Sequence, residues 1–150
     1  MSPTIFLLLV VILTTGAACA ALAAERRRRA ALRRLAEGWR MHYTPYDRFR
    51  LAARVASRLP APGAGAVRVK DLIYGLEGAE IRYIFAASYT TGTVAAERRH
   101  AAVVMFAEPR ERREDAPVEL LIAPQGLPIV EQYEHLHKRL RAAGTAAGPA

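Results

Sequence analysis

Residues 5–38 read IFLLLVVILTTGAACAALAAERRRRAALRRLAEG and join an apolar run directly to a basic one. No charged side chain occurs between Met1 and Ala24, and about twenty such residues in a helix span the roughly 30 Å hydrocarbon core of a bilayer. Arginines within about 15 to 20 residues of a membrane end stay on the cytoplasmic side. The stretch therefore predicts a single-pass transmembrane helix over residues 1–24 of a cell inner (cytoplasmic) membrane protein, with the N-terminus outside and the C-terminal domain cytoplasmic.

Two other interpretations of the apolar run stay open. The run could be a cleaved secretory signal, with AAC or ALAA as the cleavage region, or a buried helix of a soluble protein. A secretory signal normally has Lys or Arg ahead of its apolar block, and neither precedes Ile5. A lipoprotein signal would have Leu three residues before the cysteine, where this chain has Gly16 before Cys19. We therefore favour an uncleaved anchor.

The net charge of +8 is concentrated beside the apolar run. Residues 25–34 hold six arginines and one glutamate, or +5, which leaves +3 for the rest of the chain. A cation near anionic lipid contributes about 1 kcal/mol to membrane attachment, so we interpret these arginines as a membrane-surface anchor rather than as a nucleic-acid arm. They are Arg26, Arg27, Arg28, Arg29, Arg33 and Arg34. Twenty of the 22 basic residues are Arg, a bias typical of a GC-rich bacterial genome.

Helical spacing continues beyond the arginine run. Leu32, Leu35 and Ala36 recur on one side of a helix, which predicts a basic amphipathic stalk over residues 25–37 that ends at Gly38. Within the apolar run, small residues stand four apart and allow two membrane helices to approach closely, so a homo-oligomer through this helix is a candidate assembly. Those small residues are Gly16, Ala20 and Ala24.

After the stalk, GWRMHYTP (38–45) alternates apolar with polar residues and predicts a half-buried strand. Thr44, Pro45 and Asp47 then fit an N-cap, a proline at the first helical position and a capping-box acid, so we predict a helix from about Pro45 to Arg58.

Four further segments read as strands and one as a helix. The strands are AVRVKDLIYG, AEIRYIFAASYTTG, RRHAAVVMFAEP and VELLIAP, and Gly- or Pro-containing turns join them. The segment EPRERREDAP is predicted to be a solvated loop. An amphipathic helix, GLPIVEQYEHLHKRL, follows the last strand. We therefore predict an α+β domain over residues 38–141, with a small antiparallel sheet of four to five strands and two helices packed on one face. Residues 142–150 are predicted to be a disordered tail.

Sequence motifs for catalysis or cofactor binding are missing from the chain. It has no GxxxxGK[ST] or GxGxxG loop, and its serines lie outside any GxSxG context. The single cysteine excludes an intramolecular disulfide and a thiolate cluster. His135 and His137 are two apart on a predicted helix, which points them to different faces. Asp71 lies in a segment around a turn and a strand end, where a charged side chain is common. The sequence therefore predicts no catalytic residue, no metal and no cofactor.

The least ordinary stretch of the domain is YTTGT, residues 89–93, which two arginines closely follow. Hydroxyls, amides at a glycine turn and guanidinium groups are the donors that hold an anion such as a phosphate headgroup. Thr90, Thr91, Arg98 and Arg99 are therefore candidate contacts for an anion or a partner, although an exposed basic hairpin is the commoner meaning of such a stretch.

Three functions follow from these patterns. The favoured one is a membrane-anchored, cytoplasmic-facing interaction module that contacts membrane lipids and binds a protein or a lipid headgroup rather than catalysing a reaction. A membrane-bound enzyme with a site near Tyr89–His100 is an alternative, and it requires a concave pocket there with a perturbed His or carboxylate. A nucleic-acid binder, which we do not expect, would use the arginine run and Tyr74, Tyr83 and Tyr89 on one exposed face.

Two stretches of the predicted domain resemble a set of uncharacterised bacterial single-pass membrane proteins with a small C-terminal α+β domain. They are the GW at its start and the later GLEGAEIRYIFAASYTTG. The resemblance extends from Trp39 to Phe106, and those proteins usually carry an acidic-aromatic pair where this chain has Ala86 and Ala87. It depends on Trp39, Gly75, Gly78, Phe85, Tyr89 and Gly92. It implies a membrane-tethered domain and transfers no functional residue.

Overall fold

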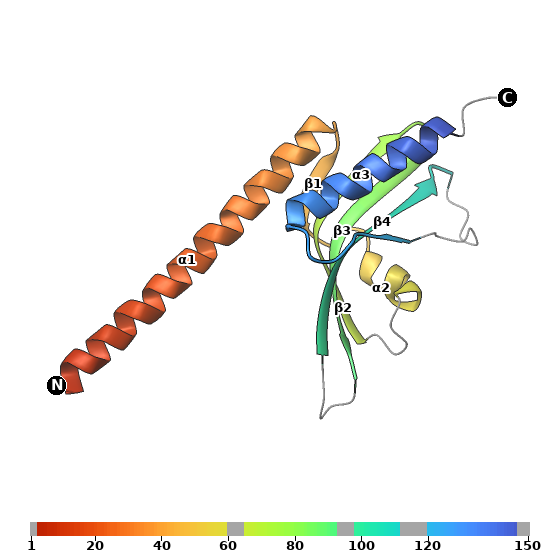
Figure 1. The fold of residues 1–150 in the computed structure, drawn as a ribbon. Helices are drawn as coiled ribbons and strands as arrows, with labels where there is room; N and C mark the ends of the chain where they lie inside the picture. Colours follow the sequence, from red (N-terminus) through yellow and green to blue (C-terminus); the bar gives the residue numbers. More distant parts are fainter. Residues whose placement is uncertain (1–2, 60–64, 93–97, 112–119, 147–150) are drawn as a thin grey trace.

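The computed structural model describes residues 3–59, 65–92, 98–111 and 120–146 (Figure 1). A long helix, α1 (Pro3–Gly38), leads into a five-stranded sheet and two further helical segments. The later elements are β1 (His42–Tyr46), α2 (Leu51–Val55), the 3₁₀ turn η1 (Ala56–Arg58), β2 (Gly65–Glu77), β3 (Glu80–Thr91), β4 (Arg98–Pro109), β5 (Leu121–Ile122) and α3 (Ile129–Ala146). The predicted α+β class and the helix at the N-terminus are confirmed.

The sheet is antiparallel throughout and its strands are in the order of the chain, β1-β2-β3-β4-β5. Such a meander needs only short connections between neighbouring strands. The β2–β3 turn is at Gly78, whose φ of +66° suits a residue without Cβ. Gly75 lies inside β2 instead, where an added Cβ would be 2.8 Å from Cγ of Met41. This glycine therefore lets the segment that enters β1 pass close to β2.

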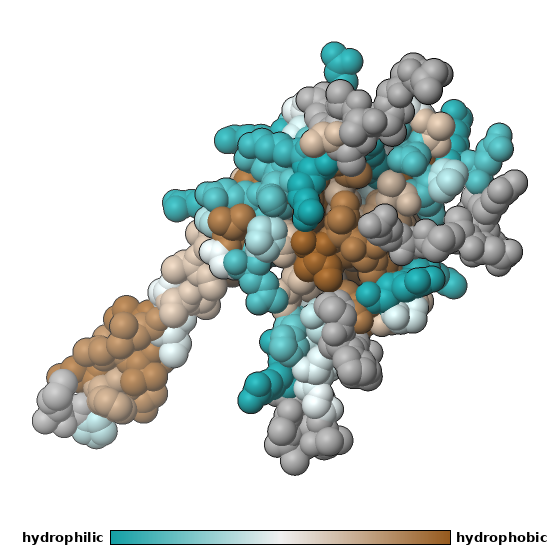
Figure 2. All heavy atoms as spheres, turned by 45° about the vertical axis from the view of Figure 1, so that its right-hand side comes forward, coloured by the Kyte–Doolittle hydropathy of each residue, from teal (hydrophilic) through white to brown (hydrophobic). Residues whose placement is uncertain are grey.

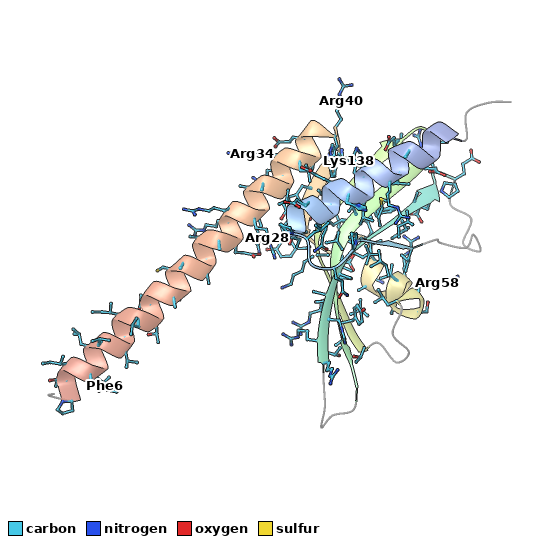
Figure 3. The ribbon with its side chains drawn as sticks, in the orientation of Figure 1. Phe6, Arg28, Arg34, Arg40, Arg58 and Lys138 are labelled. Atoms are coloured by element: carbon cyan, nitrogen blue, oxygen red, sulfur yellow. The ribbon has the colours of Figure 1, made fainter. Side chains whose placement is uncertain are left out.

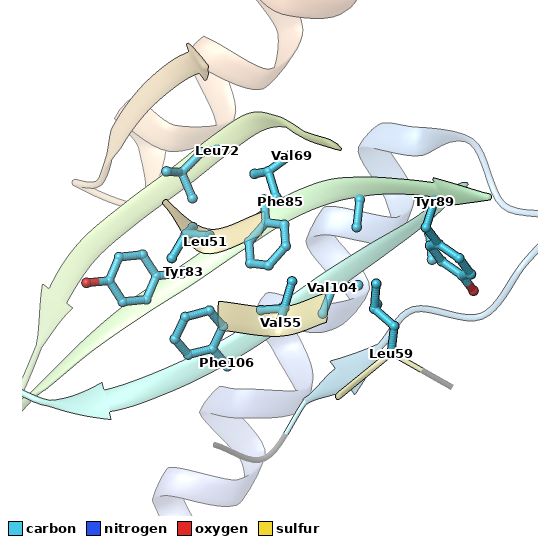
Figure 4. Packing of buried hydrophobic residues seen from close by; sticks show 12 residues of the cluster. Leu51, Val55, Leu59, Val69, Leu72, Tyr83, Phe85, Tyr89, Val104 and Phe106 are labelled. Atoms are coloured by element: carbon cyan, nitrogen blue, oxygen red, sulfur yellow. The ribbon is translucent and has the colours of Figure 1, made fainter. Parts of the chain in front are cut away.

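Helices cover both faces of the sheet, whereas we predicted both on one face. On the side that we call the α2 face, Leu51 and Val55 of α2 pack with Leu59 against β2, β3 and β4 (Figure 4). On the α3 face, Leu32 of α1 and Tyr133 of α3 pack against the same three strands. The buried strand residues are Val69, Leu72, Tyr83, Phe85, Val104 and Phe106 on the α2 face, and Ile73, Ile84, Val103 and Met105 on the α3 face.

A bulge in β2 explains how Val69 and Leu72, three residues apart, reach the same face. Side chains alternate along a strand, so residues three apart normally point to opposite faces. Between Lys70 and Ile73 the register against β3 shifts, and Asp71 has a left-handed φ of 53°. The extra residue restores the apolar alternation and turns the Asp71 side chain toward α1 and β1.

The end of α1 has the hydrogen bonds of a Schellman motif. The amide of Met41 donates to the Ala36 carbonyl at 2.8 Å, and that of Arg40, at φ 58°, donates to the Glu37 carbonyl at 3.0 Å. The predicted end of the helix at Gly38 is confirmed, although the left-handed residue is Arg40. This turn leads the chain directly into β1, which begins at His42, later than the predicted strand.

The predicted helix from Pro45 to Arg58 is wrong at its start. Pro45 lies in β1, an edge strand, where the missing N–H of proline is tolerated. The helix begins six residues later, and the Asp47 carboxylate accepts hydrogen bonds from the amides of Leu51 at 2.8 Å and Ala52 at 2.9 Å. The Asp47 carboxylate therefore caps the first turn from ahead of the N-cap position, which is Arg50 and not Thr44.

The C-terminal helix is confirmed, with its predicted apolar face against the α3 face of the sheet. It continues to Ala146, past residue 142 where we predicted the disordered tail to begin. Residues 147–150 and most of the EPRERREDAP loop are outside the described residues.

Candidate membrane-surface site

The N-terminal half of α1 is long and apolar enough to span a membrane, and its most apolar 18-residue window is not buried by any part of the domain. Large side chains such as Phe6, Leu8 and Leu13 are about two-thirds exposed. Figure 2 shows this segment as a hydrophobic rod that projects from a body with hydrophilic areas around a central hydrophobic patch. An exposed apolar surface of this size marks a site for membrane or protein contact.

The C-terminal half of α1 belongs to the core of the domain. Leu32 is fully buried and Ala36 is 1% exposed, in one cluster with residues of β2, β3, β4 and α3. Arg28 precedes Leu32 by one helical step of four residues, so these residues share the stripe that faces the sheet. Arg34 points away from the domain (Figure 3). The predicted stalk is therefore docked on the sheet over its last turns.

Asp71 joins three elements at this contact. Its side chain is 3% exposed, and it accepts hydrogen bonds from Arg28 Nη2 at 2.8 Å and from the Tyr43 hydroxyl at 2.7 Å. The Asp71 carbonyl accepts a hydrogen bond from the Tyr133 hydroxyl at 2.6 Å. A buried carboxylate needs such partners because its desolvation is costly. The bulge thereby links α1, β1 and α3 to the middle of the sheet.

Both tyrosines at Asp71 resist ionisation. Burial, then the hydrogen bond to the Asp71 carboxylate and its charge, raise the pKa of Tyr43 above its usual value. Burial, followed by the charge of Asp71, raises the pKa of Tyr133 well above its usual value. Each hydroxyl therefore stays protonated and remains a donor across the ordinary pH range.

The six arginines of the proposed anchor have different environments. Arg28 pairs with Asp71 and with Glu25, and Arg29 pairs with Glu25 at 2.9 Å, so part of their charge is neutralised within the protein. The guanidinium of Arg33 lies 5.9 Å from the centre of the Tyr43 ring. The arginines with exposed side chains in the structure are Arg26, Arg27, Arg29, Arg33 and Arg34. Arg28 is thus a docking residue in addition to any role at the membrane surface.

The four hairpin residues singled out in the sequence divide between the two faces of the sheet. Thr90 pairs with Arg99, and Thr91 pairs with Arg98 one step further along the ladder. Since successive residues alternate, Thr90 and Arg99 lie on the α3 face and the other two on the α2 face. The Thr91 hydroxyl lies 2.8 Å from His100 Nε2. The structure therefore does not bring all four together.

On the α3 face, Thr90 and Arg99 join cations that the sequence analysis did not select. Arg68 and Lys70 of β2, together with Ser88 of β3, line a concavity of about 100 Å³ with them. No signal in the sequence alone connects positions 68 and 70 with position 99, because the pairing of β2 with β3 and of β3 with β4 brings them together.

This geometry bears on the two alternative functions. The described residues around the concavity include no histidine or carboxylate, and His100 is stacked on Tyr89 at 5.4 Å on the opposite face. The enzyme alternative, which requires such a group in a pocket, stays a prediction. Tyr83 is 4% exposed and Tyr89 is 6% exposed within the core of the α2 face, so neither can stack on a nucleic-acid base.

The sequence analysis did not predict the contacts of two other polar groups. His137 is 8% exposed and stacks on Trp39 with ring centres 4.0 Å apart, where α1 meets α3. Glu108 of β4 pairs with Arg54 of α2 and accepts a hydrogen bond from the Tyr83 hydroxyl at 2.8 Å. In the parts of the chain that the structure describes, no three His, Cys, Asp or Glu side chains are grouped to hold a metal ion.

Comparison with known proteins found no matching family, no similar curated protein and no similar solved structure. The resemblance to uncharacterised single-pass bacterial proteins therefore stays a prediction.

Proposed function

We propose that this chain is a single-pass protein of a bacterial inner membrane, with its N-terminus outside and its α+β domain held at the cytoplasmic surface. In this proposal the domain is an interaction module, and it binds a protein or a lipid headgroup rather than catalysing a reaction.

The observation that carries the proposal is the division of α1 into two halves. The first half is apolar and projects free of the domain, and the second half is basic and packs into the domain core. A flexible tether would leave the domain free to diffuse around its anchor, whereas a docked helix fixes which surface of the domain faces the membrane. That arrangement suits a module that presents one surface at the bilayer.

Paired reporter fusions at the C-terminus test the orientation. Alkaline phosphatase becomes active only after export, and green fluorescent protein fluoresces only when it folds in the cytoplasm. We expect the phosphatase fusion to be inactive and the fluorescent fusion to be bright. An active phosphatase fusion would reject the proposed orientation.

A matched pair of variants shows whether the arginines set that orientation. Changing Arg26, Arg27, Arg33 and Arg34 to Gln removes exposed charge at the membrane end and leaves the Arg28–Asp71 pair intact. The control makes the same change at exposed cations far along the chain, Arg48, Arg58, Lys138 and Arg139. Only the first variant should mix the two orientations, because charges near the membrane end determine topology.

Self-association through the membrane helix is a further part of the proposal. Gly16 has open space around it in the single chain, and Ala20 and Ala24 follow at the spacing that lets helices pack closely. Changing Gly16 and Ala20 to Leu should abolish dimer cross-linking in membranes, and unchanged cross-linking would reject this contact.

A further inference from the structure

We propose that the concavity on the α3 face between Arg68, Lys70 and Arg99 binds a phosphate monoester, carried by a membrane lipid or by a free solute. This inference rests on the proposed function, since it supplies the ligand class that the membrane-held module would recognise.

The concavity follows from the pairing of large with small residues across three strands. Arg68 pairs with Ser88, which pairs with Ala101, and Lys70 pairs with Ala86. The middle strand therefore carries short side chains on this face, whereas β2 carries Arg68 and Lys70, and β4 carries Arg99 opposite Thr90. Short residues form a floor and the cations form the walls.

The lining groups are the donors that an anionic oxygen accepts from. The donors are three cationic side chains, which surround a space of about 100 Å³ together with Thr90 and with Ser88, whose hydroxyl donates to the Arg68 carbonyl at 3.5 Å. Since about 10–15 Å³ of such volume admits one water, the space is large enough for a group with several oxygens. Within the described residues, no carboxylate forms an ion pair with Arg68, Lys70 or Arg99.

The charge of the site favours a monoester over a diester. A diester phosphate carries one negative charge, whereas a monoester carries about 1.5 to 2 at neutral pH and offers three strong acceptor oxygens. Three cations against one diester would leave an excess of positive charge in the concavity. A dianionic group is a closer match, and the guanidinium forks of Arg68 and Arg99 suit its several oxygens.

One wall of the concavity lies beside the contact between β2 and α1. Lys70 is next to Asp71, which contacts Arg28 of α1 at 2.8 Å. The free ends of β2 and β4 and the N-terminal half of α1 extend toward the lower part of Figure 1.

Titration of the full chain in phospholipid nanodiscs tests the site, with the amide NMR signals of residues 66–70, 88–90 and 99–101 as the readout. One arm adds inorganic phosphate to nanodiscs of neutral phosphatidylcholine. A second arm increases the fraction of phosphatidic acid, and a third increases phosphatidylglycerol, a diester, to matched total charge. We expect saturable shifts at these residues with phosphatidic acid, with phosphate, or with both.

The arms also identify the source of the phosphate group. A response to phosphatidic acid alone assigns the site to a lipid, and a response to phosphate alone assigns it to a solute. Equal shifts with phosphatidylglycerol at matched charge would overturn the proposal, because they would show attraction to any anionic surface. An absence of shifts in all arms would overturn it as well.

Variants link the response to the three cations. Changing Arg68, Lys70 and Arg99 to Gln should weaken binding on the order of 100-fold, at about fivefold per cation. Changing Arg58, Lys138 and Arg139 to Gln removes the same charge elsewhere and should change it less than twofold. Arg99→Gln alone serves if the triple variant fails to fold. Equal weakening of binding by both sets of variants would overturn the site. The reporter fusions test a different claim: an active phosphatase fusion would reject the proposed orientation. It would not affect this titration, because both surfaces of a nanodisc are accessible.

Discussion

Replacing Asp71 with Asn removes the charge that holds α1 to the sheet and keeps the shape of the side chain. Asn also tolerates the left-handed backbone of this residue, whose φ is 53°, so the bulge itself should survive. The variant therefore tests the contact of Asp71 with Arg28 and Tyr43 rather than the strand.

The expected cost follows from the burial of the two partners. Removing one member of a fully buried ion pair costs about 3–5 kcal/mol, because the other charge is left without compensation. Here the Asp71 side chain is 3% exposed and that of Arg28 is 32% exposed, so water and the remaining ion pair with Glu25 partly compensate the Arg28 charge. The amide of Asn also keeps an acceptor for Tyr43. We therefore expect a loss of about 2–3 kcal/mol in the free energy of unfolding.

Trp39 makes this loss measurable at the contact itself. It is the only tryptophan of the chain, and it stacks on His137 where α1 meets α3. Thermal unfolding of the full chain in nanodiscs, followed by Trp emission, should give a midpoint about 8–24 °C lower for Asp71→Asn, at roughly 4–8 °C per kcal/mol for a small domain. Glu111→Gln removes an exposed carboxylate and serves as the control.

The reasoning would be refuted if Asp71→Asn changed the midpoint no more than Glu111→Gln does. A double-mutant cycle with Arg28→Gln adds a second criterion. A coupling energy near zero would mean that the 2.8 Å contact contributes nothing to docking.

Three further changes test other parts of the fold. Leu32→Ala should cost about 3 kcal/mol in urea unfolding, because it opens a cavity in a fully buried position, and a cost below 1 kcal/mol would place α1 outside the core. Gly75→Ala should cost about 1–3 kcal/mol because the new Cβ would be 2.8 Å from Met41 Cγ, and the same change should cost less in a Met41→Ala background, measured in the same assay. The raised pKa values of Tyr43 and Tyr133 mean that the unfolded chain loses these protons first, so stability should be unaffected below about pH 10 and fall above it. Absorbance at 295 nm should show both hydroxyls ionising only on unfolding, and Phe at both positions should remove that part of the alkaline loss.

The long helix, the strands and the C-terminal helix could be predicted because each carries its own pattern. The apolar run of α1 and the spacing of Ile129, Tyr133, Leu136 and Leu140 in α3 identify elements without reference to the rest of the chain. The start of α2 could not be located in the same way. Thr44, Pro45 and Asp47 satisfy a helix-start pattern, but pairing of β1 with β2 outweighs it.

The sequence contained a signal that helices cover both faces of the sheet, but the alternation of apolar and polar residues in the other strands obscured it. Residues 102–106 of β4, AVVMF, are consecutively buried, as expected for a strand covered on both sides. The docking of α1 on the sheet also had a signal in the sequence, since Arg28 lies on the same helical stripe as Leu32 and Ala36. Its partner could not be found, because Asp71 becomes a buried acceptor only through a bulge that depends on the register of β2 against β3.

Labelling of single cysteines tests the membrane placement of the domain most directly. In a Cys19→Ala background, one variant carries Ser2→Cys and another carries Ala142→Cys, near the two ends of the chain. A maleimide that cannot cross membranes is applied to spheroplasts before and after permeabilisation. We expect the cysteine at position 2 to react in intact spheroplasts and the cysteine at position 142 to react only after permeabilisation. Reaction at position 142 in intact spheroplasts would contradict a domain held at the cytoplasmic surface.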